Sequence, residues 1–380
     1  MSDNYRFKCN FDILNLIDIE DMKGDILKNN SKWNICIDSR CVRESDIFLA
    51  LKGKYADGHK FLSQAFQSKA SAAIISNREI FEEADLPLIY VKDTFKALAK
   101  IADYNFRSIE TLKIAITGSV GKTTTKDYLQ NILSNYETTF SAPESFNNEL
   151  GITISKAKLS KMDKYAIFEV GMNMKDEIGQ LSSLINPDIA VITNIAEAHI
   201  GNLGSIENIA IEKSNIIEGM PKDGIVFLPR DSDFFELLLE KASKKKLRCI
   251  TFGHSKKSDI QLSKVSRHTG GARIEFRVFG EVFETYSSMQ NKSILNNYLP
   301  VLGIASLLNY DPAEALKDIT KSSIHKSRWQ EHDFEFDGGK IKLIDDSYNA
   351  SPTSMFEAIK AIDDYESDQI LRKIIIIGDM

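Results

Sequence analysis

The chain is short of the residues and patterns that mark several classes of protein. Its 380 residues include only four cysteines, eight prolines and two tryptophans. The cysteines (Cys9, Cys36, Cys41 and Cys249) form no CxxC pair and show no paired Cys/His spacing, so we expect neither a disulfide framework nor structural zinc. No run approaches the roughly 18 apolar residues of a membrane span. The acidic, interrupted N-terminus does not fit a signal peptide. These absences predict a soluble, cytoplasmic protein without a membrane span.

An excess of positive charge is also missing. The chain carries 48 lysines and arginines against 54 acidic residues, a formal net charge of −6, so no nucleic-acid partner is expected. The lysine cluster at 241–246, "KASKKK", is interpreted as the solvated end of a helix. With 43% hydrophobic and 27% charged residues, the composition suits a globular protein of two or three domains.

Short apolar runs alternate with amphipathic stretches between about residues 112 and 253. The predicted strands are 112–117, 165–170, 188–195, 224–229 and 247–253, and the predicted helices are 122–136, 175–185, 205–220 and 231–245. This α/β alternation predicts a parallel sheet covered on both faces. Residues 259–287 change character and predict antiparallel strands, followed by helices at 291–310 and 311–320.

Two smaller segments flank this region. Before residue 110, strands at 45–53 and 70–76 and a helix at 59–69 indicate a separate α/β domain. After about residue 322, the pattern predicts a strand at 341–347, a helix at 351–366 and a strand at 372–380, where the chain stops. Because a parallel strand needs neighbours, we interpret this last domain as incomplete. The expected domains are therefore 1–109, 110–321 and 322–380.

The stretch "TGSVGKTTTK" begins at Thr117, directly after the apolar run "LKIAI". Gly118 and Gly121 let backbone N–H groups converge on phosphate oxygens, and the N-terminus of the following helix favours negative charge. Lys122 is placed to neutralise the β- and γ-phosphates, and the hydroxyl of Thr123 to hold Mg²⁺. A plain turn between a strand and a helix is the alternative. The pattern favours a nucleotide phosphate site.

Three further residues fall near the same predicted sheet edge. Glu169 ends an apolar strand, where it fits either a Mg²⁺-holding carboxylate or a paired surface glutamate. His199 follows the next strand, and a lone loop histidine is usually incidental. Lys213 lies on the apolar stripe of helix 205–220, where an ammonium should be paired, snorkelling or chemically altered. The pattern by itself favours snorkelling.

Several longer stretches now carry a resemblance to a known family. They are "ITGSVGKTTTK", "SFNNELGIT", "FEVGMNMKDEIGQLSSLINPDIAVITNIAEAHIGNLGSIENIAIEKSNI", "IDDSYNASPTSM" and, nearer the N-terminus, "DSRCVRESDIFLALKGKYADGHKF". The chain resembles the Mur ligases of peptidoglycan synthesis, and in particular their D-alanyl-D-alanine-adding branch. The resemblance implies a three-domain architecture with a central P-loop parallel-sheet ATPase domain and an incomplete Rossmann-like C-terminal domain.

The resemblance also implies an activity and its residues. The expected reaction is ATP-dependent ligation of D-alanyl-D-alanine to UDP-N-acetylmuramoyl-tripeptide through an acyl phosphate. Lys122, Lys213 and His199 would be catalytic, and Lys213 would be carbamylated by CO₂. Mg²⁺ would meet Thr123, Glu169 and His199. The expected ATP-binding residues are Gly118, Ser119, Val120, Gly121, Lys122, Thr123, Thr124, Asn148, Asn194, Arg328, Asp346 and Asn349. The expected UDP-sugar residues are Ser39, Arg40, Asp57 and His59.

The chain departs from the family pattern at a few nucleotide-side positions. Pro229 replaces a usual Asn, "QNKSILNN" replaces a G-x-H-N segment, and Ser327 replaces a Gly before Arg328. Two other functions therefore remain alternatives: a nucleotide-binding protein without ligase activity, and another amide ligase of the superfamily, either amino-acid-adding or a folylpolyglutamate synthase. We expect a monomer.

Overall fold

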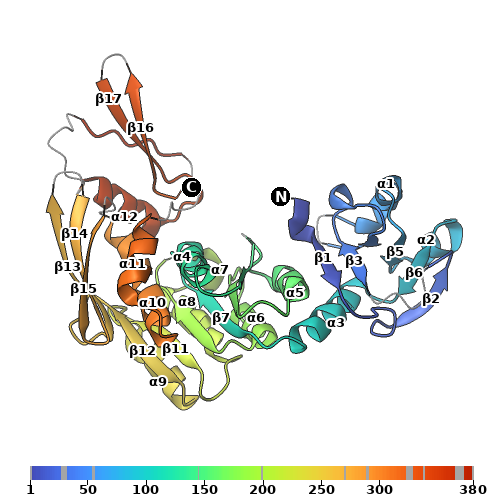
Figure 1. Ribbon diagram of the computed structural model, residues 1–380, viewed down its shortest axis with the longest axis horizontal. Coiled ribbons are helices and arrows are strands. Elements are labelled where there is room, and N and C mark those ends of the chain that lie inside the picture. Colours follow the sequence, from blue (N-terminus) through green and yellow to red (C-terminus); the bar gives the residue numbers. More distant parts are fainter. Residues whose placement is uncertain are drawn as a thin grey trace. The chain divides into compact units, whose positions relative to one another are not determined.

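The computed structural model describes residues 2–26, 32–53, 56–143, 145–197, 200–268, 271–287, 291–321, 328–336, 339–363 and 372–378 (Figure 1). The chain divides into two compact units. Unit 1 comprises residues 1–110 and 149–162, and unit 2 comprises residues 111–148 and 163–380. A six-stranded sheet lies in unit 1 and a nine-stranded sheet in unit 2.

The sheet of unit 2 is mainly parallel. In spatial order its strands are β15 (Glu281–Ser287), β14 (Gly271–Val278), β13 (Ile260–His268), β12 (Arg248–Gly253), β11 (Ile225–Pro229), β10 (Ile189–Ile192), β7 (Leu112–Thr117), β9 (Tyr165–Glu169) and β8 (Thr139–Ser141). All pairs from β8 to β13 are parallel. The five strands predicted between residues 112 and 253 are confirmed as β7, β9, β10, β11 and β12.

Strand β7 lies between β9 and β10, although it precedes both in the chain. The chain therefore builds β8 and β9 on one side of β7 and then crosses to build β10, β11 and β12 on the other side. Such a reversal of strand order opens a crevice at the carboxyl ends of the strands, where open α/β sheets bind ligands. The phosphate turn follows β7 at this point.

Both faces of this sheet are buried, as the apolar strands predicted. Ile114 and Ile116 of β7 belong to the main core together with residues of α4 and α10, and Ala115, on the alternate face, is also fully buried. The helices of unit 2 are α4 (Lys122–Ser134), α6 (Glu177–Ile185), α7 (Ile200–Leu203), α8 (Ile206–Ser214), the 3₁₀ turn η4 (Asn215–Ile217), α9 (Phe235–Lys244), α10 (Lys292–Leu307), α11 (Pro312–Lys321) and α12 (Pro352–Asp363). Helices α4, α10 and α11 pack together, and α8 packs with α6 and α9.

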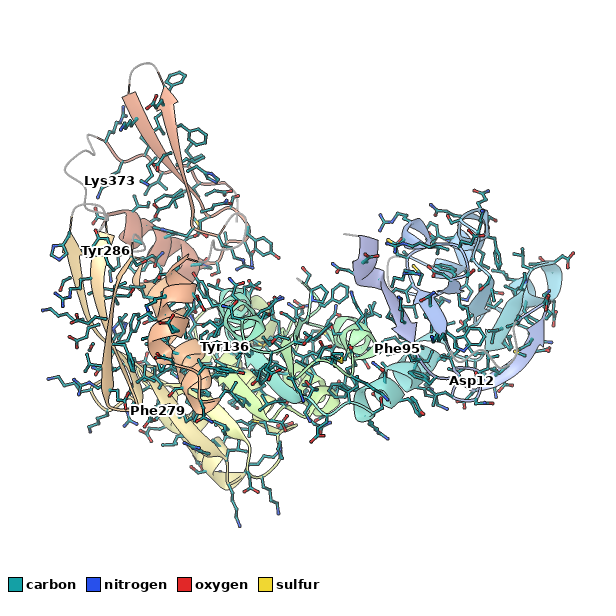
Figure 2. All side chains as sticks on the ribbon, in the orientation of Figure 1. Asp12, Phe95, Tyr136, Phe279, Tyr286 and Lys373 are labelled. Atoms are coloured by element: carbon teal, nitrogen blue, oxygen red, sulfur yellow. The ribbon has the colours of Figure 1, made fainter. Side chains whose placement is uncertain are left out.

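The predicted antiparallel segment is confirmed as β13, β14 and β15. It extends the parallel sheet through the pairing of β12 with β13. Phe279 and Tyr286, which Figure 2 labels at opposite ends of this extension, are exposed. Helices α10 and α11 cover part of it through contacts with β13 and β15.

Unit 1 is a smaller α/β unit. In spatial order its strands are β1 (Arg6–Cys9), β3 (Trp33–Cys36), β4 (Ile47–Leu49), β5 (Ala72–Ile75), β6 (Leu88–Val91) and β2 (Ile19–Lys23). The outer strands β1 and β2 are antiparallel to their neighbours and the inner pairs are parallel. The remaining elements are η1 (Ser2–Tyr5), η2 (Ser39–Cys41), η3 (Gly58–Phe61), α1 (Leu62–Gln67), α2 (Arg78–Glu83), α3 (Thr94–Arg107) and α5 (Glu149–Lys158). The predicted strands at 45–53 and 70–76 are β4 and β5.

Helix α5 belongs to unit 1, although it lies between β8 and β9 of unit 2 in the sequence. It packs against α3. The amide of Asn105 donates to the backbone oxygens of Lys156 and Leu159, at 3.0 and 2.9 Å, and the buried Lys156 forms an ion pair with Asp103. The sequence analysis predicted neither α5 nor α3. The division into three domains stays a prediction.

The C-terminal segment contains an antiparallel pair, β16 (Gln330–Phe336) and β17 (Gly339–Asp345), and helix α12. The strand predicted at 341–347 and the helix predicted at 351–366 correspond to β17 and α12. The strand predicted at 372–380 is wrong for its described part, because 372–378 form no strand. Ile376 in this stretch is 91% exposed, and none of the described strands pairs with this apolar run. Within the described ranges, every helix is too short or too polar to span a lipid bilayer.

Candidate active site

The phosphate turn joins β7 to α4 and depends on two glycines. Gly121 has φ +85°, a conformation that other residues rarely adopt. A Cβ atom at Gly121 would lie 2.2 Å from Asn297 Oδ1, and one at Gly118 would lie 1.8 Å from Thr193 Oγ1. Side chains of α10 and of the loop after β10 therefore lie in close contact with the turn. No residue other than glycine fits at either position without displacing them.

Hydrogen bonds fasten this turn to the loop that follows β10. Asn194 accepts twice: its Oδ1 from the Val120 N–H at 2.8 Å and its backbone oxygen from the Ser119 N–H at 3.1 Å. Thr193 Oγ1 donates to the Val120 backbone oxygen at 2.6 Å, and Ser119 Oγ donates to the Ala196 backbone oxygen at 2.8 Å. The turn is thus held in shape before any ligand binds. The first N–H groups of α4, including that of Thr124, have no acceptor within the helix and suit an anion.

The carboxylate of Glu169 and two cationic side chains, Lys122 and Arg328, lie around the first turn of α4. Thr123 Oγ1 donates to Glu169 Oε2 at 2.8 Å, and Asn147 Nδ2 donates to Glu169 Oε1 at 3.1 Å. Glu169 is buried, so it is not the paired surface glutamate of the alternative interpretation. Lys122 Nζ donates to the Gly118 backbone oxygen at 2.9 Å. Desolvation lowers the pKa of Lys122, although the charge of Glu169 opposes this, and the charge of Arg328 lowers the pKa further.

The paired oxygens of Thr123 and Glu169 are donors of the kind that Mg²⁺ prefers. Within the described ranges, no three His, Cys, Asp or Glu side chains gather closely enough to hold a metal ion by themselves. This fits Mg²⁺ at a nucleotide site, because that ion is usually held by one or two protein groups together with phosphate oxygens and water. The residues present therefore suit a Mg²⁺-bound triphosphate.

Lys213 is 2% exposed, and the residues before and after it on the same stripe, Ile209 and Ile216, are fully buried. The snorkelling interpretation is wrong, because the amine does not reach solvent. Burial lowers the pKa of Lys213 well below its ordinary value, the charge of Lys122 lowers it further, and the charge of Glu212 opposes both. The structure therefore places two amines, Lys122 and Lys213, within electrostatic reach of each other.

Residues from the C-terminal segment reach the same turn. Arg328 Nη2 donates to Thr123 Oγ1 at 3.2 Å, and its guanidinium lies over the Tyr348 ring with Cζ 4.0 Å from the centroid. Asp346 Oδ1 accepts the N–H of Trp329 at 3.1 Å, so it lies beside Arg328. The structure therefore brings two of the three predicted adenosine-side residues together at the phosphate turn.

The predicted UDP-sugar residues gather near the start of α1 in unit 1. Ser39 Oγ donates to Gln64 Oε1 at 2.8 Å. His59 Nε2 accepts the Ser76 N–H at 2.9 Å, so its Nδ1 carries the proton that is donated to Asp57 Oδ1 at 2.6 Å. Elements η2 and η3, which carry these residues, both contact α1.

Arg40 differs from its buried neighbours in this cluster. Its side chain is 77% exposed and pairs with Asp38, whose oxygen lies 2.6 Å from Arg40 Nη2. The hydrogen bond from Arg40 lowers the pKa of Asp38. The cluster therefore presents one exposed cation beside buried Ser39 and His59 and half-buried Asp57, which are hydrogen-bonded within the unit.

Family models match two parts of the chain. The Mur ligase middle domain matches residues 116–305, and the Mur ligase family catalytic domain matches residues 33–105. The chain belongs to the Mur ligase family. A UDP-N-acetylmuramoyl-tripeptide–D-alanyl-D-alanine ligase of Bacillus subtilis is 32% identical over 346 residues, which cover 91% of this Mur ligase and 73% of the relative. The ligase of the same name from Rickettsia prowazekii is 32% identical over 365 residues, covering 94% and 78%.

Solved structures agree with this membership. MurF from Acinetobacter baumannii has a TM-score of 0.78 at 28% identity, covering 87% of this Mur ligase and 71% of that chain. MurF ligase from Thermotoga maritima in complex with ADP has a TM-score of 0.73 at 28% identity, covering 86% and 74%. A folylpolyglutamate synthase of Mycobacterium tuberculosis shares the fold at 18% identity, with a TM-score of 0.51.

Three residues expected from the Mur ligase resemblance are not among those described above at the turn. His199 lies outside the described residues. Asn148 is exposed, and it is its neighbour Asn147 that contacts Glu169. Asn349 is also exposed, and its Oδ1 accepts the N–H of Ala350 at 3.0 Å. Of the departures from the family pattern, Pro229 ends β11, and Asn291 within "QNKSILNN" caps α10 by accepting the Ser293 N–H at 2.9 Å.

The sequence analysis missed three residues of this Mur ligase site and one contact of a residue that it had predicted, Arg328. Asn147, Thr193 and Asn297 contact Glu169 or the phosphate turn, and Arg328 contacts Thr123 rather than only an adenosine position. Asn147 and Thr193 each adjoin a predicted residue, which was a usable signal. Asn297 lies 176 positions beyond Gly121, and the one signal for it was its place in the segment "QNKSILNN", which departs from the family pattern.

Proposed function

We propose that this Mur ligase joins D-alanyl-D-alanine to UDP-N-acetylmuramoyl-tripeptide with ATP, forming an amide bond in peptidoglycan precursor synthesis. The observation that carries the proposal is the similarity to ligases of that name along 91% of the chain. The preformed phosphate turn, with Lys122, Thr123 and Glu169 around it, supports ATP as the energy source. The four cysteines are free thiols, which supports a cytoplasmic location.

The reaction begins with the terminal carboxylate of the tripeptide, which attacks the γ-phosphorus of ATP. The bond from that phosphorus to the β,γ-bridging oxygen breaks, giving ADP and an acyl phosphate. The free amine of D-alanyl-D-alanine then attacks the acyl carbon, and inorganic phosphate leaves as the amide forms and the amine loses a proton. ATP is needed because a carboxylate is a poor acyl donor near neutral pH.

The chain's own groups stabilise charge during these steps. Lys122 and the first N–H groups of α4 donate hydrogen bonds to the anionic phosphate oxygens, and they require little reorganisation because the turn is already fastened to Asn194. Mg²⁺, held by Thr123 and Glu169, would neutralise further charge on the phosphates. Arg328 lies close enough to Thr123 to reach a phosphate oxygen.

We also propose that Lys213 is carbamylated. Its buried amine has a lowered pKa, which favours the neutral form that attacks CO₂. The amine lone pair forms the new N–C bond as one C=O π pair of CO₂ moves to oxygen, and the nitrogen then loses a proton, so the neutral amine becomes an anionic carbamate. An anion beside Lys122 and Mg²⁺ is favourable, whereas an ammonium there would repel them.

The remaining proposed residues would contact either the nucleotide and its metal ion or the UDP-sugar. Asp346, Asn349, Asn148 and His199 are proposed on the nucleotide and metal side. Ser39, Arg40, Asp57 and His59 are proposed at the UDP-sugar, where exposed Arg40 suits the diphosphate.

The test is ADP release by the purified protein with UDP-N-acetylmuramoyl-tripeptide, with and without D-alanyl-D-alanine, together with detection of the ligated product. We expect sustained turnover only when both substrates are present. Turnover that does not depend on the dipeptide would contradict the assignment. ATP binding by calorimetry with no product from either substrate pair would favour a nucleotide-binding protein without ligase activity.

A further inference from the structure

Glu212 precedes Lys213 on α8, and both side chains are 2% exposed. A buried carboxylate beside a buried amine would be expected to pair with it. Instead both oxygens of Glu212 accept from another helix: Oε2 from the Asp176 N–H and Oε1 from the Ile178 N–H, each at 2.9 Å. Asn215 Nδ2 also donates to Oε2, at 3.2 Å.

These contacts cap the N-terminus of α6 from outside that helix. Asp176, at its N-cap position, has φ +68° and makes no side-chain cap hydrogen bond of its own. The N–H groups of a first helical turn need acceptors, and a carboxylate there also suits the helix dipole. Glu212 supplies both the acceptor and the charge. Its removal would leave the buried N–H of Ile178 and the partly buried N–H of Asp176 without this acceptor.

The capped turn leads back to the active site. Residues 170–176 connect Glu169, at the end of β9, to α6. The Glu212 carboxylate therefore ties α8, which carries Lys213, to the far end of the segment that begins at Glu169. Close packing makes this contact possible, because Gly219 lies against Ser182 of α6, where a Cβ would meet the Ser182 backbone oxygen at 2.1 Å.

We propose that Glu212 is a positioning residue of the ligase, whose carboxylate holds α8 against the start of α6 and so keeps the Lys213 amine at the nucleotide site. The proposal rests on the proposed function, since it assumes that Lys213 acts there. It concerns Glu212 alone, which neither a metal ion nor a substrate needs to touch.

The test compares Glu212→Gln with a matched control, Glu177→Gln. Glutamine has nearly the same shape but offers one acceptor oxygen, so one of the two backbone N–H groups loses its partner. Glu177 fastens the same loop, since its Oε2 accepts the Asn173 N–H at 2.6 Å, but it lies on α6 and has no bond to α8 among the described contacts. The control separates loop fastening from the positioning of Lys213.

The measurements are kcat, KM for ATP and the ¹³C NMR signal of a lysine carbamate in ¹³C-bicarbonate. For Glu212→Gln we expect kcat to fall about 10-fold or more, KM for ATP to change less than about 3-fold, and the carbamate signal to weaken. Glu177→Gln should stay near wild type in all three. Equal kcat in the two variants would overturn the proposal, because a structural role alone predicts no difference between them.

Two further comparisons keep the test decisive. If Glu212→Gln does not fold, Glu212→Asp takes its place. Aspartate keeps both carboxylate oxygens but retracts them by one methylene, so kcat should fall. Wild-type kcat in Glu212→Asp would overturn the proposal. Failure of the proposed function is seen separately, since wild-type protein would then give no ligated product. An active wild-type protein without a carbamate signal would refute only the proposed carbamylation of Lys213. The kcat values of the Glu212 variants would still test the positioning role of Glu212.

Discussion

The phosphate site in unit 2 and the polar cluster in unit 1 differ in how their charged side chains are desolvated and paired. Around the phosphate turn, the half-buried Lys122 and the fully buried Lys213 both have lowered pKa values, with desolvation as the main cause. In the unit 1 cluster the polar groups bond to one another: Asp57 accepts from His59, and Arg40 pairs with Asp38. One site holds two amines that desolvation shifts toward the neutral form, and the other holds polar groups that already have hydrogen-bond or ion-pair partners.

The difference indicates what each site is built to receive. A buried cation without a full counter-charge destabilises the folded protein until an anion arrives, so the ligand's own charge becomes the missing partner. The triphosphate, Mg²⁺ and a carbamate together would supply that balance in unit 2. The unit 1 cluster needs no such balance, and it would recognise its ligand by shape and by the single exposed guanidinium of Arg40. Four predictions test this contrast.

The largest effect is expected for Lys213→Ala. Removing the group proposed to become an anion should lower ligation at least about 100-fold, since catalytic electrostatic groups contribute on that scale. Excess bicarbonate should not restore turnover, whereas a small carboxylic acid that fills the space should restore part of it. Product formation measures both. Wild-type activity in Lys213→Ala would refute the carbamate role and leave Lys122 as the one functional amine of this site in the comparison.

Lys122→Ala should act on binding as well as turnover. Its ammonium is a fixed partner for the phosphates, and truncating one member of such a buried charge pair weakens affinity about 10- to 100-fold. Calorimetric titration with ATP measures this, with Lys213→Ala as the control expected to keep near-normal affinity. Unchanged ATP affinity in Lys122→Ala would count against the phosphate assignment.

Arg40→Ala tests the neutralised cluster. Loss of an exposed guanidinium should raise KM for UDP-N-acetylmuramoyl-tripeptide about 5- to 10-fold and leave KM for ATP unchanged. The fold should be unaffected, because the side chain is 77% exposed. Steady-state kinetics in both substrates is the measurement. A change in KM for ATP alone would mean that the residue serves a different ligand.

The smallest expected effect is the uptake of a fraction of a proton when ATP binds. Because burial lowers the pKa of Lys122 and bound phosphates raise it again, ATP binding at about pH 9 should take up less than one proton. The uptake should fade as pH falls below the lowered pKa, where the free amine is already charged. Binding enthalpies in two buffers measure it, with Lys122→Arg as the permanently charged control. Uptake should be absent for the UDP substrate, since Arg40 and Asp38 stay charged at that pH.

The elements that follow from local pattern were predicted well. Strands β7, β9, β10, β11 and β12 are apolar runs bounded by turn residues, and the phosphate turn is a short motif read within ten residues. Both arise from chemistry between near neighbours in the chain: backbone periodicity, glycine conformation and the polarity of a helix start. The C-terminal run at 372–378 had the same local pattern but forms no strand, because a strand also needs a partner.

What local pattern could not supply is the assembly of distant segments. Three observations depend on residues far apart in the chain. Strand β7 lies between β9 and β10, α5 belongs to unit 1, and Asn297 lies close to Gly121. Lys213 is the clearest case, since its helical stripe allowed snorkelling as well as burial, and only packing chose burial. The residues therefore set which chemistry is available, and the folded arrangement sets which side chains lose water and meet, because desolvation and charge coupling depend on spatial neighbours that the order of residues does not specify.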